Sequence, residues 1–168
     1  MAREINLQRG LVTIVDDEDY PTLSTYKWYA VRSSSNLYVQ RFAVDENGKK
    51  HSIRMSRQIL GLGPGDKRVA DHINRNTLDN RRSNLRACTN AQNRWNSPVN
   101  RASKSGLKGV FYSPLHGTEK CWRAQIWANS KRINLGRFHT SEEAYAAYCK
   151  AARQYHGEFV CQAVTQGM

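Results

Sequence analysis

The sequence lacks several features that mark whole classes of protein. No apolar run approaches the roughly 20 residues needed to cross a bilayer, so we expect no membrane span and no membrane partner. The first ten residues, MAREINLQRG, have no apolar stretch after their charges, which argues against a signal peptide. The four cysteines lie far apart without a C-x-x-C pair, which predicts reduced thiols in the cytoplasm rather than a disulfide frame or a zinc site.

Acidic residues are also scarce. The chain has 14 Asp and Glu against 26 Lys and Arg, for a formal net charge of +12. The imbalance is concentrated in residues 71–100, with five basic residues against two acidic ones, and in residues 101–140, with eight against one. Basic residues interleaved with aromatics suit a phosphate backbone better than a lipid surface. Nucleic acid is therefore the expected partner, and the alternative is a basic face that only keeps the protein in solution.

The apolar pattern predicts a β-rich first third of the chain. Residues 4–60 contain β-branched and aromatic runs separated by turn-like clusters, and the Asn47-Gly48 pair predicts a hairpin. From residue 107 onward the runs LKGVFYS, KCWRAQIWAN and KRINLGRF predict three further strands. Alternation in the second run predicts that Trp122, Ala124, Ile126 and Ala128 face a helix, and that Arg123, Gln125 and Trp127 lie on the other face. The last periodic run, TSEEAYAAYCKAARQYHG, predicts a helix that Thr140 and Glu143 begin with a capping box.

Residues 69–96 combine seven Asn and five Arg with few apolar residues. The run RVADHI predicts a strand end that presents Asp71 and His72 on opposite faces, and NAQNRWN has a composition compatible with a helix that supplies Asn93. Carboxylate and amide oxygens suit a hard divalent cation, and a neutral His can take a proton from water. These residue types together suit the hydrolysis of a phosphodiester.

The segment DHINRNTLDNRRSNLRACTNAQNRWN resembles the HNH nuclease motif, the ββα-metal finger, in its phage and intron-encoded homing-endonuclease branch. The matching positions are Asp71-His72, then Asn80 to Asn84-Leu85-Arg86, then Asn93. The resemblance implies that His72 is the general base and that Asp71 and Asn93 bind one divalent metal, Mg²⁺ or Mn²⁺. It also implies that Asn84 braces the loop and orients the His72 ring.

Alternatives stay open within this segment. His72 could be an ordinary buried histidine, neighbouring Asn residues could cap turns, and Asn90 or Asn96 could replace Asn93 as the ligand. No zinc is expected, because no thiolate or second His completes a tetrahedral site. The candidates for contact with DNA phosphates are Arg81, Arg82, Arg86 and Arg94.

The C-terminal part resembles the Apetala-two DNA-binding domain, in which three antiparallel strands pack on one helix. The matching segments are KGV at 108–110, WRAQI at 122–126, LGRFHTSEEAYAAY at 135–148 and HGEF at 156–159. The residues that would face the DNA major groove are Lys108, Phe111, Ser113, Arg123, Gln125, Trp127, Arg132 and Asn134. The alternative for Phe111 and Trp127 is a place in the core, and Arg137 could be a solvated charge or a phosphate contact. Because Phe111, Ser113 and Asn134 differ from the residues usual in plant domains, the plant target sequence is not transferred.

The predicted fold class is α+β. Its parts are a β-rich N-terminal region at 1–66, a ββα-metal HNH finger at 67–96, a basic linker at 97–106, an Apetala-two-like domain at 107–160 and a tail at 161–168. The expected function is site-specific cleavage of double-stranded DNA by a homing-type endonuclease, a monomer rather than a dimer, in the cytoplasm of a bacterial host if the gene is phage-borne. The alternatives are a catalytically inactive DNA-binding regulator and a low-specificity RNA-binding or ribosome-associated protein.

Overall fold

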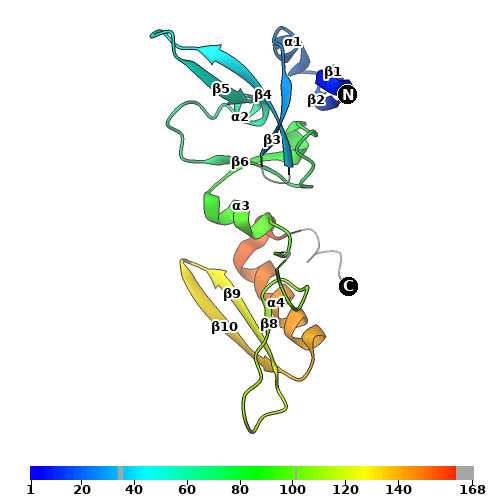
Figure 1. Ribbon diagram of the computed structural model, residues 1–168, viewed down its shortest axis with the longest axis vertical. Coiled ribbons are helices and arrows are strands. Elements are labelled where there is room, and N and C mark those ends of the chain that lie inside the picture. The colour runs from blue at the N-terminus through cyan, green and yellow to red at the C-terminus, as the bar shows by residue number, and fades with distance from the viewer. Residues whose placement is uncertain (34–35, 101, 162–168) are drawn as a thin grey trace. The chain divides into compact units, whose positions relative to one another are not determined.

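The computed structural model of the protein describes residues 1–33, 36–100 and 102–161 (Figure 1). The chain divides into two compact units, Met1–Asn93 and Arg94–Met168. Within the described ranges no helix has both the length and the apolar character to cross a membrane. Residue 101 of the predicted linker and residues 162–168 of the predicted tail lie outside the described residues. The five-part division drawn from the sequence stays a prediction.

The first unit begins with two small antiparallel sheets. The elements of this part are β1 (Ala2–Asn6), the 3-10 turn η1 (Gln8–Gly10), β2 (Val12–Asp16), α1 (Tyr20–Leu23), β3 (Tyr29–Ser33), β4 (Asn36–Val44), β5 (Lys50–Arg54) and α2 (Met55–Ile59). Strand β1 pairs with β2, and the other three strands pair in the order β3-β4-β5. Strands β2 to β5 fall on the apolar runs that predicted them. The short helix α1 replaces part of a predicted turn, and Pro21 in its first turn suits the start of a helix.

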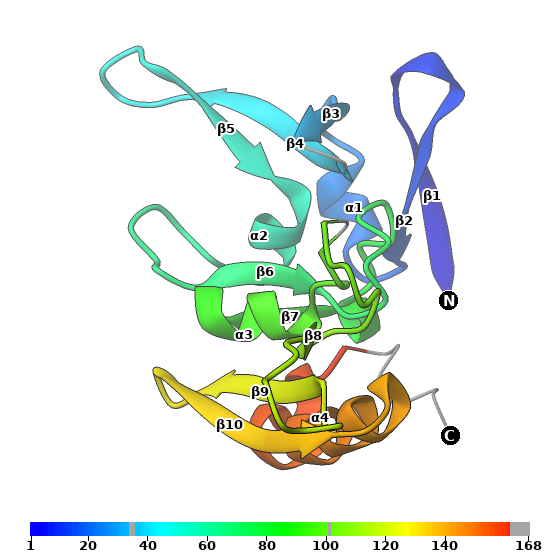
Figure 2. The ribbon, with the colours of Figure 1, turned by 60° about the horizontal axis from the view of Figure 1, so that its bottom comes forward.

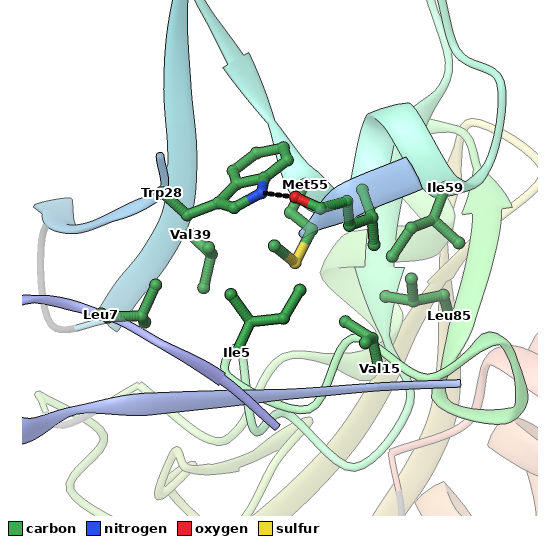
Figure 3. Close-up of a cluster of buried hydrophobic side chains, with 9 residues drawn as sticks. Ile5, Leu7, Val15, Trp28, Val39, Met55, Ile59 and Leu85 are labelled. Atoms are coloured by element: carbon green, nitrogen blue, oxygen red, sulfur yellow. Dashed lines mark hydrogen bonds between the residues drawn. The ribbon is translucent and has the colours of Figure 1, made fainter. Parts of the chain in front are cut away.

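Nine buried apolar side chains form the core of this unit (Figure 3). They are Ile5, Leu7, Val15, Leu23, Trp28, Val39, Met55, Ile59 and Leu85. The indole Nε1 of Trp28 donates to the carbonyl oxygen of Leu23 at 2.8 Å, which satisfies its polar atom inside the cluster. Leu85 comes from the Asp-His segment, so that segment packs into the same core as the N-terminal strands.

The Asp-His segment folds as a hairpin followed by a helix. Strand β6 (Val69–His72) pairs antiparallel with β7 (Leu85–Cys88), with Asp71 opposite Arg86 and His72 opposite Leu85. The connection between the strands includes the 3-10 turn η2 (Arg82–Asn84), and α3 (Asn90–Asn96) follows β7 after one residue. Figure 2 shows this ββα order along the chain. The predicted strand end and helix are both present.

The second unit contains a three-stranded antiparallel sheet packed on one helix. Its elements are β8 (Val110–Tyr112), β9 (Trp122–Ala128), β10 (Lys131–Phe138), α4 (Ser141–His156) and the 3-10 turn η3 (Gly157–Phe159), and the strand order is β10-β9-β8. Ala124, Ile126 and Ala128 are buried, as the alternation of β9 predicted. The capping box of Thr140 and Glu143 begins α4 as predicted. These features confirm the predicted mixed fold class.

One glycine allows the helix to approach the sheet closely. Gly109 has φ of +75°, and a Cβ atom there would lie 2.1 Å from the Tyr148 ring of α4. Any side chain at this position would therefore push the helix off the first strand.

Candidate active site

His72 ends strand β6 and is buried, with 5% of its surface exposed. Its Nε2 lies 3.2 Å from Oδ1 of Asn80. Because an amide oxygen only accepts hydrogen bonds, Nε2 carries the ring proton in the neutral imidazole and Nδ1 carries the lone pair. The nitrogen able to accept a proton is therefore Nδ1.

The surroundings of His72 favour its neutral form. Burial lowers the pKa of the imidazole below its usual range and outweighs the opposing effect of the Asn80 hydrogen bond and of the charges of Asp71 and Asp79. The positive charge of Arg54 acts in the same direction as burial. A neutral imidazole at neutral pH is the form that a general base requires.

Asn84 braces the loop between the strands, but Asn80 contacts the His72 ring. Oδ1 of Asn84 accepts from the backbone N–H of Asn74 at 2.9 Å, and its Nδ2 donates to the carbonyl oxygen of Asp79 at 2.7 Å. Both side-chain bonds go to the loop. The hydrogen bond to the His72 ring comes from Asn80. A catalytic role of Asn84 stays a prediction.

Asp71 lies across the hairpin from Arg86 and forms a buried ion pair with it. Nε and Nη2 of Arg86 lie 2.9 and 2.8 Å from Oδ2 of Asp71, and the two side chains are 11% and 6% exposed. The guanidinium offsets the cost of burying the carboxylate. Arg86, expected at the DNA backbone, thus has a partner inside the protein.

Cys88 links the position of Asp71 to that of Asn93. Burial and the charge of Asp71 raise the pKa of the Cys88 thiol to about 11, against the opposing effects of the Arg86 charge and of the Asn93 backbone N–H. That N–H donates to the carbonyl oxygen of Thr89 at 3.0 Å. Asp71 and Asn93 therefore both lie close to one thiol. Of the alternative ligands, Asn90 is exposed and Asn96 is buried in the second unit.

The donor types of Asp71 and Asn93 fit a hard divalent cation. In the described ranges no three His, Cys, Asp or Glu side chains converge. Asp71 and Asn93 would contribute a carboxylate and an amide oxygen, and Mg²⁺ ordinarily completes such a shell with water and phosphate oxygens. Since Asp71 and Arg86 together are neutral, the charge of an added dication calls for an anionic ligand such as a phosphodiester.

Known proteins match the chain across this site. A family profile described as HNH endonuclease matches residues 58–95, which include β6, β7 and Asn93. An uncharacterised HNH endonuclease of Acanthamoeba polyphaga mimivirus is 28% identical over 151 residues, covering 90% of this chain and 74% of the relative. Protein 3.8 of Escherichia phage T7 is 33% identical over 89 residues, covering 53% of this chain and 70% of the relative. No solved structure matches.

The chain belongs to the HNH endonuclease family. It is therefore a nuclease, and an HNH nuclease implies DNA as substrate and, in general, the use of a divalent metal. The profile ends at residue 95, so the C-terminal sheet lies outside it.

Two further arginines of this HNH endonuclease have acidic partners. Nη2 of Arg81 lies 2.7 Å from Asp79, and Nη2 of Arg82 lies 2.7 Å from Asp19. Both arginine side chains keep at least 40% of their surface exposed, and Arg94 is exposed on α3. Their contact with DNA stays a prediction.

The C-terminal sheet of the HNH endonuclease has one open face. The strand register places Phe111 opposite Arg123, Gln125 opposite Asn134 and Trp127 opposite Arg132. These six predicted DNA contacts therefore share a face. The alternative that Phe111 and Trp127 are core residues is wrong, because they are 42% and 58% exposed.

The other two predicted DNA contacts of this unit, Lys108 and Ser113, have hydrogen-bond partners within the protein. Nζ of Lys108 donates to the carbonyl oxygens of Arg94, Trp95 and Ser97 at 3.2, 2.7 and 2.5 Å. A cation at the carbonyl end of a helix is electrostatically favourable, so Lys108 caps α3. Its contact with DNA stays a prediction.

Ser113 is held by Arg137. Nη1 of Arg137 donates to the Ser113 carbonyl oxygen at 2.6 Å, and its Nη2 lies 3.3 Å from the Ser113 hydroxyl. Arg137 therefore braces the loop after β8. The sequence carries no local signal for the contacts of Asn80, Lys108 and Arg137, because their partners are backbone groups or distant side chains.

Proposed function

We propose that this HNH endonuclease hydrolyses phosphodiester bonds of double-stranded DNA at specific sites, with one divalent ion, Mg²⁺ or Mn²⁺, per active site. The observation that supports this most is the buried pair Asp71 and His72 at the end of β6. Arg86 neutralises the first residue, and Asn80 holds the ring of the second. A buried, neutral histidine beside an oxygen ligand suits proton transfer from water next to a phosphate.

In the proposed reaction, Nδ1 of His72 accepts a proton from a water molecule. The water oxygen forms a bond to phosphorus while the bond between phosphorus and the 3′ oxygen breaks. The electron pair of the broken bond stays on the 3′ oxygen. Asp71 and Asn93 would hold the metal, which when bound stabilises the charge on the phosphate and on the leaving oxygen. Asn80 and Asn84 keep the base and its loop in place.

The open face of the C-terminal sheet is the proposed reader of DNA. It combines the guanidinium groups of Arg123 and Arg132 with the amides of Gln125 and Asn134, all placed on one face by the strand register. Arg and Asn or Gln are the side chains best suited to bidentate hydrogen bonds with guanine and adenine in the major groove. The proposal includes that the enzyme is a homing-type endonuclease and that its C-terminal unit is an Apetala-two-like domain.

A cleavage assay tests metal use and the ligand together. Supercoiled plasmids carrying host-genome fragments are incubated with the protein and Mg²⁺ or with EDTA. We expect open-circular product only with Mg²⁺, because one active site in a monomer cuts one strand. In the variant Asn93→Ala we expect half-maximal cleavage to require more Mg²⁺.

The matched control is Asn90→Ala, which removes an exposed Asn from the same helix. Its Mg²⁺ dependence should equal that of the wild type, and an effect of this variant alone would assign the ligand to Asn90. Cleavage in EDTA would contradict metal use. Plasmid that is retarded on a gel at its own site but never cut would instead support the inactive DNA-binding regulator.

A further inference from the structure

We propose that Thr13, in the N-terminal strand β2, is a positioning residue that determines which nitrogen of His72 accepts the proton. The inference rests on the proposed function, in which His72 is the general base. Thr13 lies outside residues 58–95, where the family profile matches. The N-terminal strands would thus contribute to the catalytic step through the Asn80 amide.

A directed chain of hydrogen bonds connects Thr13 to the base. The Thr13 hydroxyl donates to the carbonyl oxygen of Leu78 at 2.8 Å, which commits its only proton because a carbonyl cannot donate. The hydroxyl oxygen can then only accept, and Nδ2 of Asn80 donates to it at 2.9 Å. The amide therefore presents its nitrogen to Thr13 and its oxygen to His72 Nε2.

The hydrogen-bonded side chains of Thr13 and Asn80 are buried, and the backbone of β2 fixes the position of Thr13. Thr13 and Asn80 are 0% and 1% exposed, so no bulk water replaces a lost partner. The backbone of β2 holds the same loop segment, because the N–H of Ile14 donates to Leu78 at 2.9 Å and the N–H of Asn80 donates to Ile14 at 2.8 Å. Rotating the Asn80 amide would leave buried donors facing each other, which is energetically costly.

The opposite amide orientation would change the chemistry of His72. An NH₂ group facing Nε2 would require a lone pair there, and the ring proton would move to Nδ1. Nδ1 could then no longer accept a proton from water. Thr13 acts on the reaction only through Asn80, without touching the DNA or the reacting atoms.

Nitrogen NMR of the full-length protein, labelled with ¹⁵N-histidine, reads the tautomer directly. Long-range ¹H–¹⁵N spectra distinguish the two ring tautomers, and the variant His72→Gln identifies the His72 signals. We expect a single Nε2–H form in the wild type. In Thr13→Val, which keeps the shape but removes the hydroxyl, we expect a detectable Nδ1–H population. We also expect kcat to fall about tenfold, with little change in KM for DNA.

The conservative variant Thr13→Ser keeps the hydroxyl and should restore both the tautomer and the rate. The matched control is Thr77→Val, which removes another threonine hydroxyl that ties the same loop, in this case to the carbonyl of Leu37. That variant should keep the Nε2–H form, because it removes only the hydroxyl and keeps the Thr77 carbonyl, which accepts from Nδ2 of Asn80 at 3.4 Å. A structural weakening of the loop alone would affect both variants alike.

Two results would overturn the inference. One is an Nδ1–H form of His72 in the wild-type spectrum, a test that does not depend on the folding of Thr13→Val. The other is Thr13→Val with the wild-type tautomer and rate. If His72→Gln cleaves DNA normally, the proposed function fails first. If His72→Gln is inactive while Thr13→Val behaves as wild type, only the role of Thr13 fails.

Discussion

Individual cations of this protein are committed to partners that a charge count does not reveal. Arg86 pairs with Asp71, Arg81 pairs with Asp79, and Lys108 binds backbone carbonyls at the end of α3. Arg81 and Arg86 were expected at DNA phosphates, and Lys108 was expected in the major groove. The net positive charge of the protein attracts DNA. A basic side chain that balances a buried carboxylate or caps a helix also stabilises the folded state.

Lys108→Met is expected to lower the free energy of unfolding by about 1–3 kcal/mol, because three carbonyl oxygens lose a charged donor. DNA affinity at fixed salt should stay close to that of the wild type. Chemical unfolding and a gel-shift titration measure the two quantities. The control is Lys150→Met on the exposed side of α4, which should change neither. If Lys108→Met has normal stability but binds DNA more weakly, Lys108 contacts DNA rather than stabilising the end of α3.

Asp79 should make the protein sensitive to acid. The hydrogen bond from Arg81 holds the pKa of the Asp79 carboxyl below its usual range. A depressed folded pKa adds stability above the unfolded value of about 3.9, and that stability is lost as the pH falls through the folded value. We therefore expect Asp79→Asn to be less stable than the wild type at pH 7 by about 1–3 kcal/mol, and the gap to close in acid.

Urea unfolding at neutral and acid pH measures that gap. The surface variant Asp17→Asn serves as control, because the ion pair of Asp17 with Arg3 joins two half-exposed side chains. A gap between Asp79→Asn and the wild type that stays constant from neutral to acid pH would show that the Arg81 bond does not stabilise the folded state through ionisation.

At the scale of elements, patterns local in sequence predicted the structure well. The alternation of β9 correctly separated Ala124 and Ile126 from Arg123 and Gln125, and the capping box correctly began α4. Strand β1 was missed as an element because Ile5 is the only buried residue of its five. Contacts that close over long sequence separations, such as Thr13 to Asn80, leave no periodic signal in either partner.

The open sheet face should contribute phosphate or base contacts that depend on salt. Arg132→Gln removes a cation from this face opposite Trp127, and we expect weaker DNA binding with a salt slope reduced by about one. Lys150→Gln, on the helix, removes the same charge from the protein elsewhere. Binding titrations at several salt concentrations distinguish the two. If both variants change DNA affinity and the salt slope equally, the sheet face makes no specific contact and attracts DNA only through its charge.

For the whole molecule, the sequence pattern led to the correct enzyme family, because the Asp-His pair and its Asn residues occur within one short segment. Their supporting contacts come from farther away. Leu85 joins a core built by N-terminal strands, and Asn80 is held by β2. The first compact unit therefore extends from Met1 to Asn93 and includes the whole Asp-His hairpin. The motif predicted the reacting groups from one short segment, whereas the contacts that support these residues come from the entire first unit.

The most direct test of the account is single-turnover cleavage by His72→Gly with and without added imidazole. The account predicts that the variant binds DNA normally and cleaves it about 10²- to 10⁴-fold more slowly, the usual contribution of a general base. It further predicts that imidazole partly restores the rate, because the buried position of the ring becomes a cavity beside Asn80. A variant that cleaves at the wild-type rate without imidazole would contradict the assignment of His72 as the base.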